Sequence, residues 1–308
     1  MGSKFLCRKV LRGESTSGVA SWEDTDGIFS LFEDGSEIRS FEEPLEDLLH
    51  QAGTSSAVWS IGSNAICKVK TWTDGMEMES STLAFIKASA PNIPVPDVIY
   101  AWVDEELSRT FLILKRVQGN TLAEAWPSLA SEKRDYIANT VAQYCSDLAK
   151  ITSDKLQSAT GRGVLEPFLN VCAKDSHPSW RPRLLGPMSF ASSEKYLQRI
   201  SKLCSPPVTD AFYFYHADLG PTNLLISEDG MVEAILDWES AGFYPKFWIS
   251  LKPYISPGFC LPVADDRYAW ADLLIAKLTG KGFVLDMTCV EWYKKLDLEF
   301  FDTTTFGI

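Results

Sequence analysis

The stretch that decides the fold of this chain is His216-Ala-Asp-Leu-Gly-Pro-Thr-Asn223, followed by Ile235-Leu-Asp-Trp-Glu239. The first segment has the pattern H-x-D-x-x-x-x-N, and the chain of 308 residues contains only three histidines, so a chance match is improbable. Apolar runs at 212–215 and 232–236 predict short strands beside these segments. One loop therefore presents an Asp and an Asn together, and a second Asp follows at a strand end.

These residue types suit the transfer of a phosphoryl group, which needs positioning and charge neutralisation more than covalent help. A carboxylate must face the acceptor hydroxyl, orient it and accept its proton, and Asp218 fits that role. Mg²⁺ prefers hard oxygen ligands, which the Asn223 amide and the Asp237 carboxylate would provide. His216 follows an apolar strand, so we interpret it as a scaffold of the loop rather than a proton carrier. The alternative interpretation of the motif is an Asp in a turn and an Asn that caps it.

Composition argues against several other classes of protein. Acidic residues outnumber basic ones by 41 to 29, and the formal net charge of −12 argues against nucleic-acid binding. The hydrophobic content of 45% argues against wholesale disorder, and no apolar run of about 18 residues predicts a membrane span. Seven scattered cysteines without a C-x-x-C pair predict neither a zinc site nor a disulfide framework. We therefore expect a cytoplasmic protein with no membrane or nucleic-acid partner.

The predicted elements divide the chain into three parts. Residues 1–49 form an acidic N-terminal extension, with eleven acids and one base between positions 13 and 47. This extension is either solvated or attracts a cationic substrate, and its aromatic residues favour partial packing. Residues 50–117 form a sheet-rich part, with strands at 57–61, 65–69, 98–103 and 110–114 and a helix over 75–88. Residues 118–308 are mainly helical, with an irregular insertion at 155–193.

The catalytic-loop motifs resemble those of the aminoglycoside phosphotransferase/choline kinase family. Segments 235–245 and 119–129 are also similar to that family, and 235–245 is closest to the version seen in filamentous-fungal members. The resemblance covers about residues 50–250. It implies an α+β, bilobal protein-kinase-like fold, with an antiparallel sheet plus one helix in a small N-lobe and a larger, mainly helical C-lobe. It also implies that the chain binds ATP and Mg²⁺.

The resemblance assigns nucleotide-binding roles to residues of the predicted N-lobe. Lys68 matches the strand lysine that the family uses on the α- and β-phosphates, and Glu79 matches the helix glutamate that pairs with it. Lys115 and Val117 occupy the family's hinge, where backbone groups would bind the adenine edge. A lysine on a strand is otherwise an ordinary solvent-facing residue.

The sequence departs from the kinase pattern at two places. It has no G-x-G-x-x-G over the phosphates, and the nearest substitute is Gly53, Thr54, Ser55 and Ser56, whose N–H and hydroxyl groups could bind phosphate. An ordinary loop is an equally good interpretation of these four residues. The metal motif is Asp-Trp-Glu rather than Asp-Phe-Gly, so Glu239 either approaches a second metal ion or caps a turn.

The leading functional hypothesis is an ATP- and Mg²⁺-dependent O-phosphotransferase that acts on a hydroxyl of a small molecule. The alternatives are a kinase-fold binding module without phosphoryl transfer and an enzyme of this fold that performs another reaction in a specialised pathway. The substrate would bind near the 155–205 insertion and the aromatic-rich tail, where cation–π contacts would favour a cationic acceptor. For most of these aromatic residues, a place in the core of the C-lobe is the better explanation. The sequence specifies no protein partner.

Overall fold

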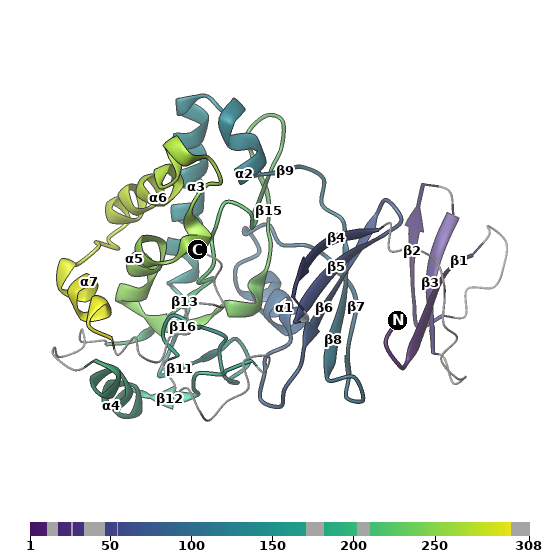
Figure 1. The fold of residues 1–308 in the computed structure, drawn as a ribbon, viewed down its shortest axis with the longest axis horizontal. Helices are drawn as coiled ribbons and strands as arrows, with labels where there is room; N and C mark the ends of the chain where they lie inside the picture. The colour runs from purple at the N-terminus through teal and green to yellow at the C-terminus, as the bar shows by residue number, and fades with distance from the viewer. Residues whose placement is uncertain are drawn as a thin grey trace. The chain divides into compact units, whose positions relative to one another are not determined.

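The computed structural model describes residues 1–10, 18–25, 27–33, 47–53, 55–170, 182–201 and 210–296. The chain divides into two compact units (Figure 1). Unit 1 consists of Met1–Asp74, Pro96–Val117 and Ser179–Pro182, and unit 2 consists of Gly75–Val95, Gln118–Pro178 and Arg183–Ile308. The helix that the sequence predicts within residues 50–117 therefore clusters with unit 2 rather than with the strands on either side of it.

Unit 1 contains a five-stranded antiparallel sheet with the order β4-β5-β6-β8-β7. The apolar runs that predict strands correspond to its four best-buried members, and β8 has four consecutive buried residues, Phe111–Leu114. The fifth member, β4, is mostly exposed at the edge of the sheet, and its short sequence of two leucines followed by His50 and Gln51 carries no strand signal. The strands are β4 (Leu48–Ala52), β5 (Ser56–Ile61), β6 (Ala65–Thr71), β7 (Val98–Asp104) and β8 (Arg109–Lys115).

A second antiparallel sheet in unit 1 is built from the N-terminal residues, in the order β1-β3-β2. Its strands are β1 (Phe5–Val10), β2 (Ala20–Asp24) and β3 (Gly27–Glu33). Phe5 packs against Trp102 of the larger sheet, with ring centroids 4.7 Å apart, and both belong to one hydrophobic core. Asp104 adds a polar contact, because it accepts hydrogen bonds from the Ser3 backbone N–H at 2.6 Å and from the Ser3 hydroxyl at 2.9 Å.

The predicted acidic extension therefore contributes three strands and part of a core. On the second strand, the Asp24 carboxylate accepts hydrogen bonds from the Ser63 N–H at 3.1 Å, in the turn between β5 and β6. Positions 34–46, which carry part of the acidic run, lie outside the described residues.

Unit 2 combines seven helices with two small antiparallel sheets among its described residues. One sheet has the order β10-β13-β16-β11-β12 and the other has the order β15-β14-β9. The helices are α1 (Glu79–Ser89), α2 (Leu122–Ala125), α3 (Ser131–Leu148), α4 (Phe190–Ile200), α5 (Lys246–Ile255), α6 (Ala269–Gly280) and α7 (Met287–Lys294). The strands are β9 (Asn120–Thr121), β10 (Thr152–Ser153), β11 (Lys155–Ser158), β12 (Met188–Ser189), β13 (Phe212–Tyr215), β14 (Leu224–Ile226), β15 (Val232–Ile235) and β16 (Gly242–Pro245).

Most aromatic residues of the predicted aromatic-rich tail belong to the core of unit 2. Six of them are at most 5% exposed, which supports the core interpretation for them: Phe243, Tyr244, Trp248, Phe259, Trp270 and Trp292. Tyr254 differs from these six, because 47% of its surface is exposed. A cation–π role for the buried rings would require the substrate to enter the core.

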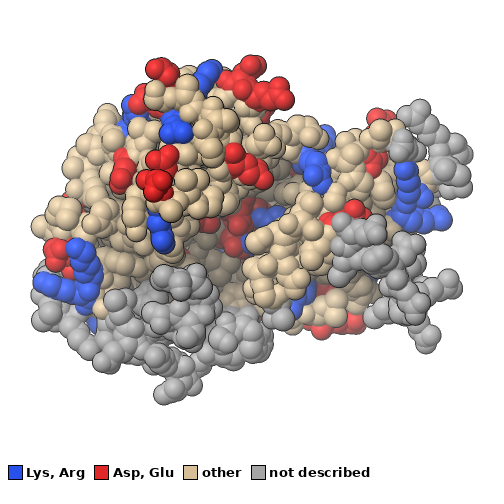
Figure 2. Space-filling view, turned by 45° about the horizontal axis from the view of Figure 1, so that its top comes forward, with Lys and Arg blue, Asp and Glu red and all other residues tan. Residues whose placement is uncertain are grey.

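Acidic and basic side chains are interspersed on the face of the molecule that Figure 2 shows. The acidic groups drawn there lie at several separate places rather than in one patch. Among the described residues, none of the helices combines the length and the apolar character needed to cross a bilayer.

The packing of the N-terminal sheet leads to a stability prediction. We expect Phe5→Ala to lower the free energy of unfolding by about 3–5 kcal/mol, because it removes a buried ring from a packed aromatic cluster. Leu107→Ala, at a side chain that is 46% exposed, is the control and should change stability by less than about 0.5 kcal/mol. Urea denaturation measures both. Equal, small effects would mean that residues 1–10 are a solvated extension after all.

Candidate active site

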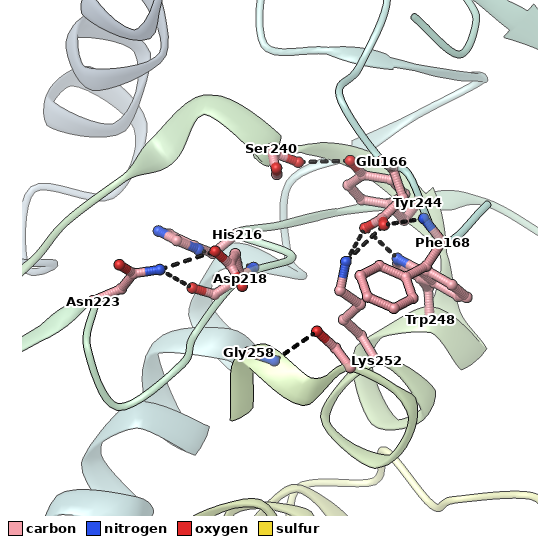
Figure 3. Close-up of polar contacts among 11 residues, drawn as sticks. Glu166, Phe168, His216, Asp218, Asn223, Ser240, Tyr244, Trp248, Lys252 and Gly258 are labelled. Atoms are coloured by element: carbon pink, nitrogen blue, oxygen red, sulfur yellow. Dashed lines mark hydrogen bonds and ion pairs between the residues drawn. The ribbon is translucent and has the colours of Figure 1, made fainter. Parts of the chain in front are cut away.

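The loop after β13 begins at the buried residue His216, which Figure 3 shows beside Asp218, and its ring makes two hydrogen bonds. Nδ1 of His216 accepts a hydrogen bond from the Asp218 backbone N–H at 3.1 Å. Because Nδ1 is the acceptor, Nε2 carries the proton and donates to the Leu236 carbonyl at 2.9 Å. The imidazole also lies edge-on to Trp238, with ring centroids 4.5 Å apart. The ring therefore ties the loop after β13 to the residue that follows β15.

Asp218 and Asn223 lie in contact within this loop. The Asn223 amide nitrogen donates to the Asp218 backbone carbonyl at 2.9 Å and to Asp218 Oδ2 at 3.0 Å. Since both partners can only accept, the amide oxygen of Asn223 must point away from Asp218. Within the described part of the chain, Oδ1 of Asp218 accepts no hydrogen bond. One oxygen of this carboxylate is thus held and the other is left open.

The electrostatic surroundings of Asp218 are dominated by burial. Burial is the main cause that raises the pKa of Asp218 to about 6, and the positive charge of Lys252 opposes this increase. Repulsion from Asp237, Glu166 and Glu239 adds to it. A carboxyl group with this pKa is mostly ionised at pH 7. Several negative charges are therefore concentrated around the loop.

Asp237 adopts a left-handed backbone conformation, with φ 60° and ψ 62°. This conformation costs a non-glycine residue roughly 1–2 kcal/mol, so the residues around it must hold it in place. On one side, the Leu236 N–H donates to the Asn223 carbonyl at 2.8 Å. On the other side, the Trp238 N–H donates to Glu79 Oε1, at the first turn of α1, at 3.2 Å. Asp237 is consequently fixed next to Asn223.

The oxygen donors of this segment fit Mg²⁺. The Asn223 amide oxygen and the Asp237 carboxylate are hard ligands, and Mg²⁺ commonly takes one or two carboxylates while it keeps several waters. No group of three or more His, Cys, Asp or Glu side chains suited to a metal occurs among the described residues. Glu239 lies in the one-turn 3₁₀ helix Trp238–Ser240. Its two predicted roles, second-metal ligand and turn cap, stay predictions.

Lys68 lies in the middle of β6, within unit 1. It pairs with Val58 on β5 and with Leu112 on β8, and the residue is only 9% exposed. Burial of an ammonium group is costly, so a lysine at such a position needs a negative partner or ligand. Glu79 begins α1 in unit 2. The pairing of these two side chains stays a prediction.

The loop between β4 and β5 contains the four residues predicted to lie over phosphates. Gly53 has φ +54°, and a Cβ built on it would meet no atom within 4 Å. The N–H and the hydroxyl of Ser55 both donate to the Ala52 carbonyl, at 3.2 and 2.9 Å. Ser56 begins β5, and Thr54 lies outside the described residues. The loop is therefore a tight, exposed turn.

The predicted hinge follows β8. The Lys115 N–H donates to the Asp97 carbonyl at 2.9 Å, and Lys115 Nζ lies 3.3 Å from the Asp97 carboxylate. Neither the N–H nor the carbonyl of Val117 makes a hydrogen bond within the described ranges. Of the two predicted residues, Val117 has the backbone groups that a ligand could bind.

Sequence reasoning missed a buried ion pair whose charges act on Asp218. Lys252 Nζ lies 2.6 and 2.7 Å from the two carboxylate oxygens of Glu166, and the two side chains are 3% and 0% exposed. Glu166 also accepts hydrogen bonds from the Trp248 indole N–H and the Phe168 backbone N–H, each at 3.1 Å. Figure 3 shows these groups around the Lys252 ammonium. The available signal was a lysine on the buried face of the otherwise apolar helix α5.

Comparison with known proteins identifies one family model, described as the phosphotransferase enzyme family, which matches residues 51–246. Among curated proteins, none matches the chain significantly. Among solved structures, an aminoglycoside-3'-phosphotransferase of type VIII is 17% identical, with a TM-score of 0.50, and the match covers 84% of this chain and 93% of that one. At this identity the match shows the fold alone, which is the α+β, protein-kinase-like fold.

Two further solved structures match with lower TM-scores. The streptomycin–ATP–APH(2")-IIa ternary complex is 11% identical, with a TM-score of 0.48 and coverage of 80% of this chain and 82% of that one. The aminoglycoside phosphotransferase APH(3'')-Id from Streptomyces rimosus is 16% identical, with a TM-score of 0.47 and coverage of 81% and 91%.

The buried ion pair leads to a prediction about unit 2. Lys252→Met should lower the free energy of unfolding by about 3–5 kcal/mol, because it leaves the Glu166 carboxylate buried without its counter-charge. The double variant Glu166→Gln/Lys252→Met should recover much of this loss. Lys150→Met is the control. Lys150 pairs with Asp147, but its side chain is 72% exposed, and exposed ion pairs contribute less than about 1 kcal/mol. Denaturant unfolding measures all three variants. Equal losses of stability in Lys252→Met and Lys150→Met would contradict the role of the buried ion pair.

Proposed function

Because this chain belongs to the phosphotransferase enzyme family, we propose that it is an ATP- and Mg²⁺-dependent O-phosphotransferase that acts on a hydroxyl group of a small molecule. The observation that carries the proposal is the 3.0 Å contact between Asp218 and Asn223, in a loop that His216 ties to the residue before Asp237. A carboxylate with one open oxygen beside two hard oxygen donors is the set of groups that phosphoryl transfer requires.

Asp218 is the general base of the proposed reaction. Its Oδ1 accepts a hydrogen bond from the acceptor hydroxyl and takes the proton as the hydroxyl oxygen bonds to the γ-phosphorus of ATP. The bond from that phosphorus to the β,γ-bridging oxygen breaks, and ADP leaves with the electron pair. Asn223 holds Oδ2, so the carboxylate is oriented before the substrate arrives.

The residues around the base have supporting roles in this proposal. Asn223 Oδ1 and the Asp237 carboxylate would hold Mg²⁺, which neutralises charge on the phosphates when bound. His216 positions the loop through its two hydrogen bonds and transfers no proton.

The nucleotide would bind through residues of unit 1 together with Glu79. Lys68 would bind the α- and β-phosphates, with Glu79 as its partner, and its burial in β6 supports a role beyond solvation. The backbone of Val117 would bind the adenine edge, since its N–H and carbonyl make no hydrogen bond within the described residues, whereas the N–H of Lys115 already binds Asp97. Gly53 and the serines that follow it would lie over the phosphates.

A cationic acceptor fits this site best. Asp218, Asp237 and Glu239 are all acidic and lie close enough for two of the charges to raise the pKa of the third. An amine on the hydroxylated substrate would be attracted by this charge, at a strength that falls with ionic strength.

Two measurements test the proposed function directly. Calorimetry would measure the binding of ATP with and without Mg²⁺, and an ADP-release assay would screen hydroxylated amines and sugars, among them ethanolamine, 1-amino-2-propanol and glucosamine. ATP that binds but is never consumed would favour the alternative of a kinase-fold binding module. Consumption of ATP without a phosphorylated product would favour a different reaction.

Asp218→Asn separates catalysis from binding. The substitution keeps the size of the side chain but removes the charge and the proton acceptor, so we expect transfer to slow by roughly 10²–10⁴-fold while ATP affinity stays nearly normal. Rates of ADP release and calorimetric Kd values for ATP check the two parts. Asn223→Asp keeps an oxygen donor for Mg²⁺ but replaces the amide that holds Asp218 Oδ2 by a second carboxylate, so it should also slow transfer. Transfer that persists at the wild-type rate in Asp218→Asn would remove Asp218 as the base.

Asp237→Ala and His216→Ala should fail in different ways. Loss of the Asp237 carboxylate leaves Mg²⁺ short of a hard ligand, so the Mg²⁺-dependent part of ATP binding should disappear. His216→Ala removes two buried hydrogen bonds, so it should lower stability by about 1–3 kcal/mol with some activity left. Calorimetry at several Mg²⁺ concentrations and thermal unfolding distinguish the outcomes. If His216→Ala abolished Mg²⁺-dependent ATP binding and Asp237→Ala only lowered stability, the assigned roles of metal ligand and loop scaffold would be wrong.

A further inference from the structure

The N-terminal sheet binds the turn between β5 and β6 through one buried carboxylate, that of Asp24 at the end of β2. The Ser63 backbone N–H lies 3.1 Å from each oxygen of this carboxylate, and the Ser63 hydroxyl donates to Oδ1. The bond from the Ser63 side chain is the main cause that lowers the pKa of Asp24, so the carboxylate is ionised at pH 7 and these bonds are charge-assisted. A Cβ on Gly62 would overlap Asp24 Oδ2, so the carboxylate also lies directly against the backbone of the turn.

The same turn holds the predicted hinge on its other side. The Asn64 carbonyl accepts a hydrogen bond from the Arg116 backbone N–H at 2.8 Å. The Arg116 guanidinium adds a second link, because it donates to the Ser60 hydroxyl at 2.5 Å and that hydroxyl donates to the first carbonyl of the turn at 2.6 Å. The next residue is Val117, whose N–H and carbonyl bind no other group within the described residues. Asp24 therefore stabilises the turn that fixes the backbone one residue before Val117.

A second polar attachment of the N-terminal residues lies at the opposite end of β8. The hydroxyl of Ser3, just before β1, donates to Asp104 at 2.9 Å. Asp104 pairs with Arg109, the first residue of β8, whereas the hinge follows its last residue, Lys115. The N-terminal sheet also precedes residues 51–246, which the family model matches. One of its two attachments thus lies at the hinge, and the other provides a comparison within the same sheet.

We propose that Asp24 is a positioning residue for nucleotide binding, which holds the β5–β6 turn and thereby keeps the backbone of Val117 in the conformation that binds the adenine edge. The inference rests on the proposed function, because it assumes that Val117 binds adenine. Without the carboxylate, the turn and the hinge adopt other conformations for part of the time. The apparent Kd for ATP then rises as the binding-competent fraction falls.

Three variants test this role. Asp24→Ala removes every bond to the turn from this side chain. Asp24→Asn is the conservative variant, since an amide oxygen in the place of Oδ1 still accepts from the N–H and the hydroxyl of Ser63. Ser3→Ala is the matched control, because it removes a polar contact of the same sheet at the far end of β8.

Calorimetry measures the Kd for ATP, and hydrogen exchange measures protection of the backbone around Arg116. We expect Asp24→Ala to raise this Kd about 3- to 10-fold and to speed exchange at Arg116, because hydrogen bonds to a charged group contribute free energy of this order. Asp24→Asn and Ser3→Ala should stay within about twofold of the wild-type Kd, with exchange at Arg116 unchanged.

Each outcome decides for or against the inference. A Kd within about twofold of wild type in folded Asp24→Ala, whatever the exchange rate at Arg116, would overturn the role of Asp24. An equal rise in Ser3→Ala would also overturn it, since the effect would then be a general loss of structure. If thermal unfolding shows that Asp24→Ala does not fold, Ser63→Ala replaces it, because that variant loses only the hydroxyl bond to Asp24 and should raise the Kd about threefold. A wild-type protein that binds no ATP would show that the proposed function is wrong as well.

Discussion

Two hydrogen bonds to one buried imidazole hold the candidate active site of unit 2 together. His216 receives the Asp218 N–H on one ring nitrogen and donates to the Leu236 carbonyl from the other. A neutral ring with a single tautomer meets both demands, whereas a protonated ring would have no acceptor for the Asp218 N–H. Asn223 closes the arrangement, because its side chain binds Asp218 and its carbonyl accepts the Leu236 N–H. Two segments about twenty residues apart thus form one polar network.

This network contains unfavourable elements that the surrounding core must offset. Asp237 is held in a left-handed conformation, and a complete ion pair is buried nearby. Neither favours stability compared with an apolar core, since buried charges and strained backbone carry desolvation and conformational costs. Proteins retain such unfavourable elements where function requires a particular arrangement of side chains, even though that arrangement lowers the stability of the fold. The buried tryptophans and phenylalanines of unit 2 supply the compensating apolar burial.

Sequence patterns predicted the strands and the loop whose structure depends on residues close together in the sequence. Alternating apolar runs identified β5 to β8, and the five-residue spacing from Asp218 to Asn223 indicated one loop with two adjacent side chains. Contacts between distant segments left no such pattern. Glu166 and Lys252 meet across 86 positions, and Trp238 binds Glu79 across 159. The strands β1 to β3 were obscured because acidic residues dominate the composition of the first fifty positions, while their apolar side chains face inward.

The N-terminal sheet also constrains the order in which the chain can fold during synthesis. Ser3 finds its partner Asp104 only 101 positions later, and Phe5 joins a core that includes Phe111. These strands leave the ribosome before β7 and β8 and must therefore wait until both have been made, with α1 of the other unit emerging in between. Closing such a long loop delays folding, and apolar strand surface stays exposed in the meantime. The acidic residues that follow the third strand, six between positions 34 and 47, would keep the waiting segment from associating with other nascent chains.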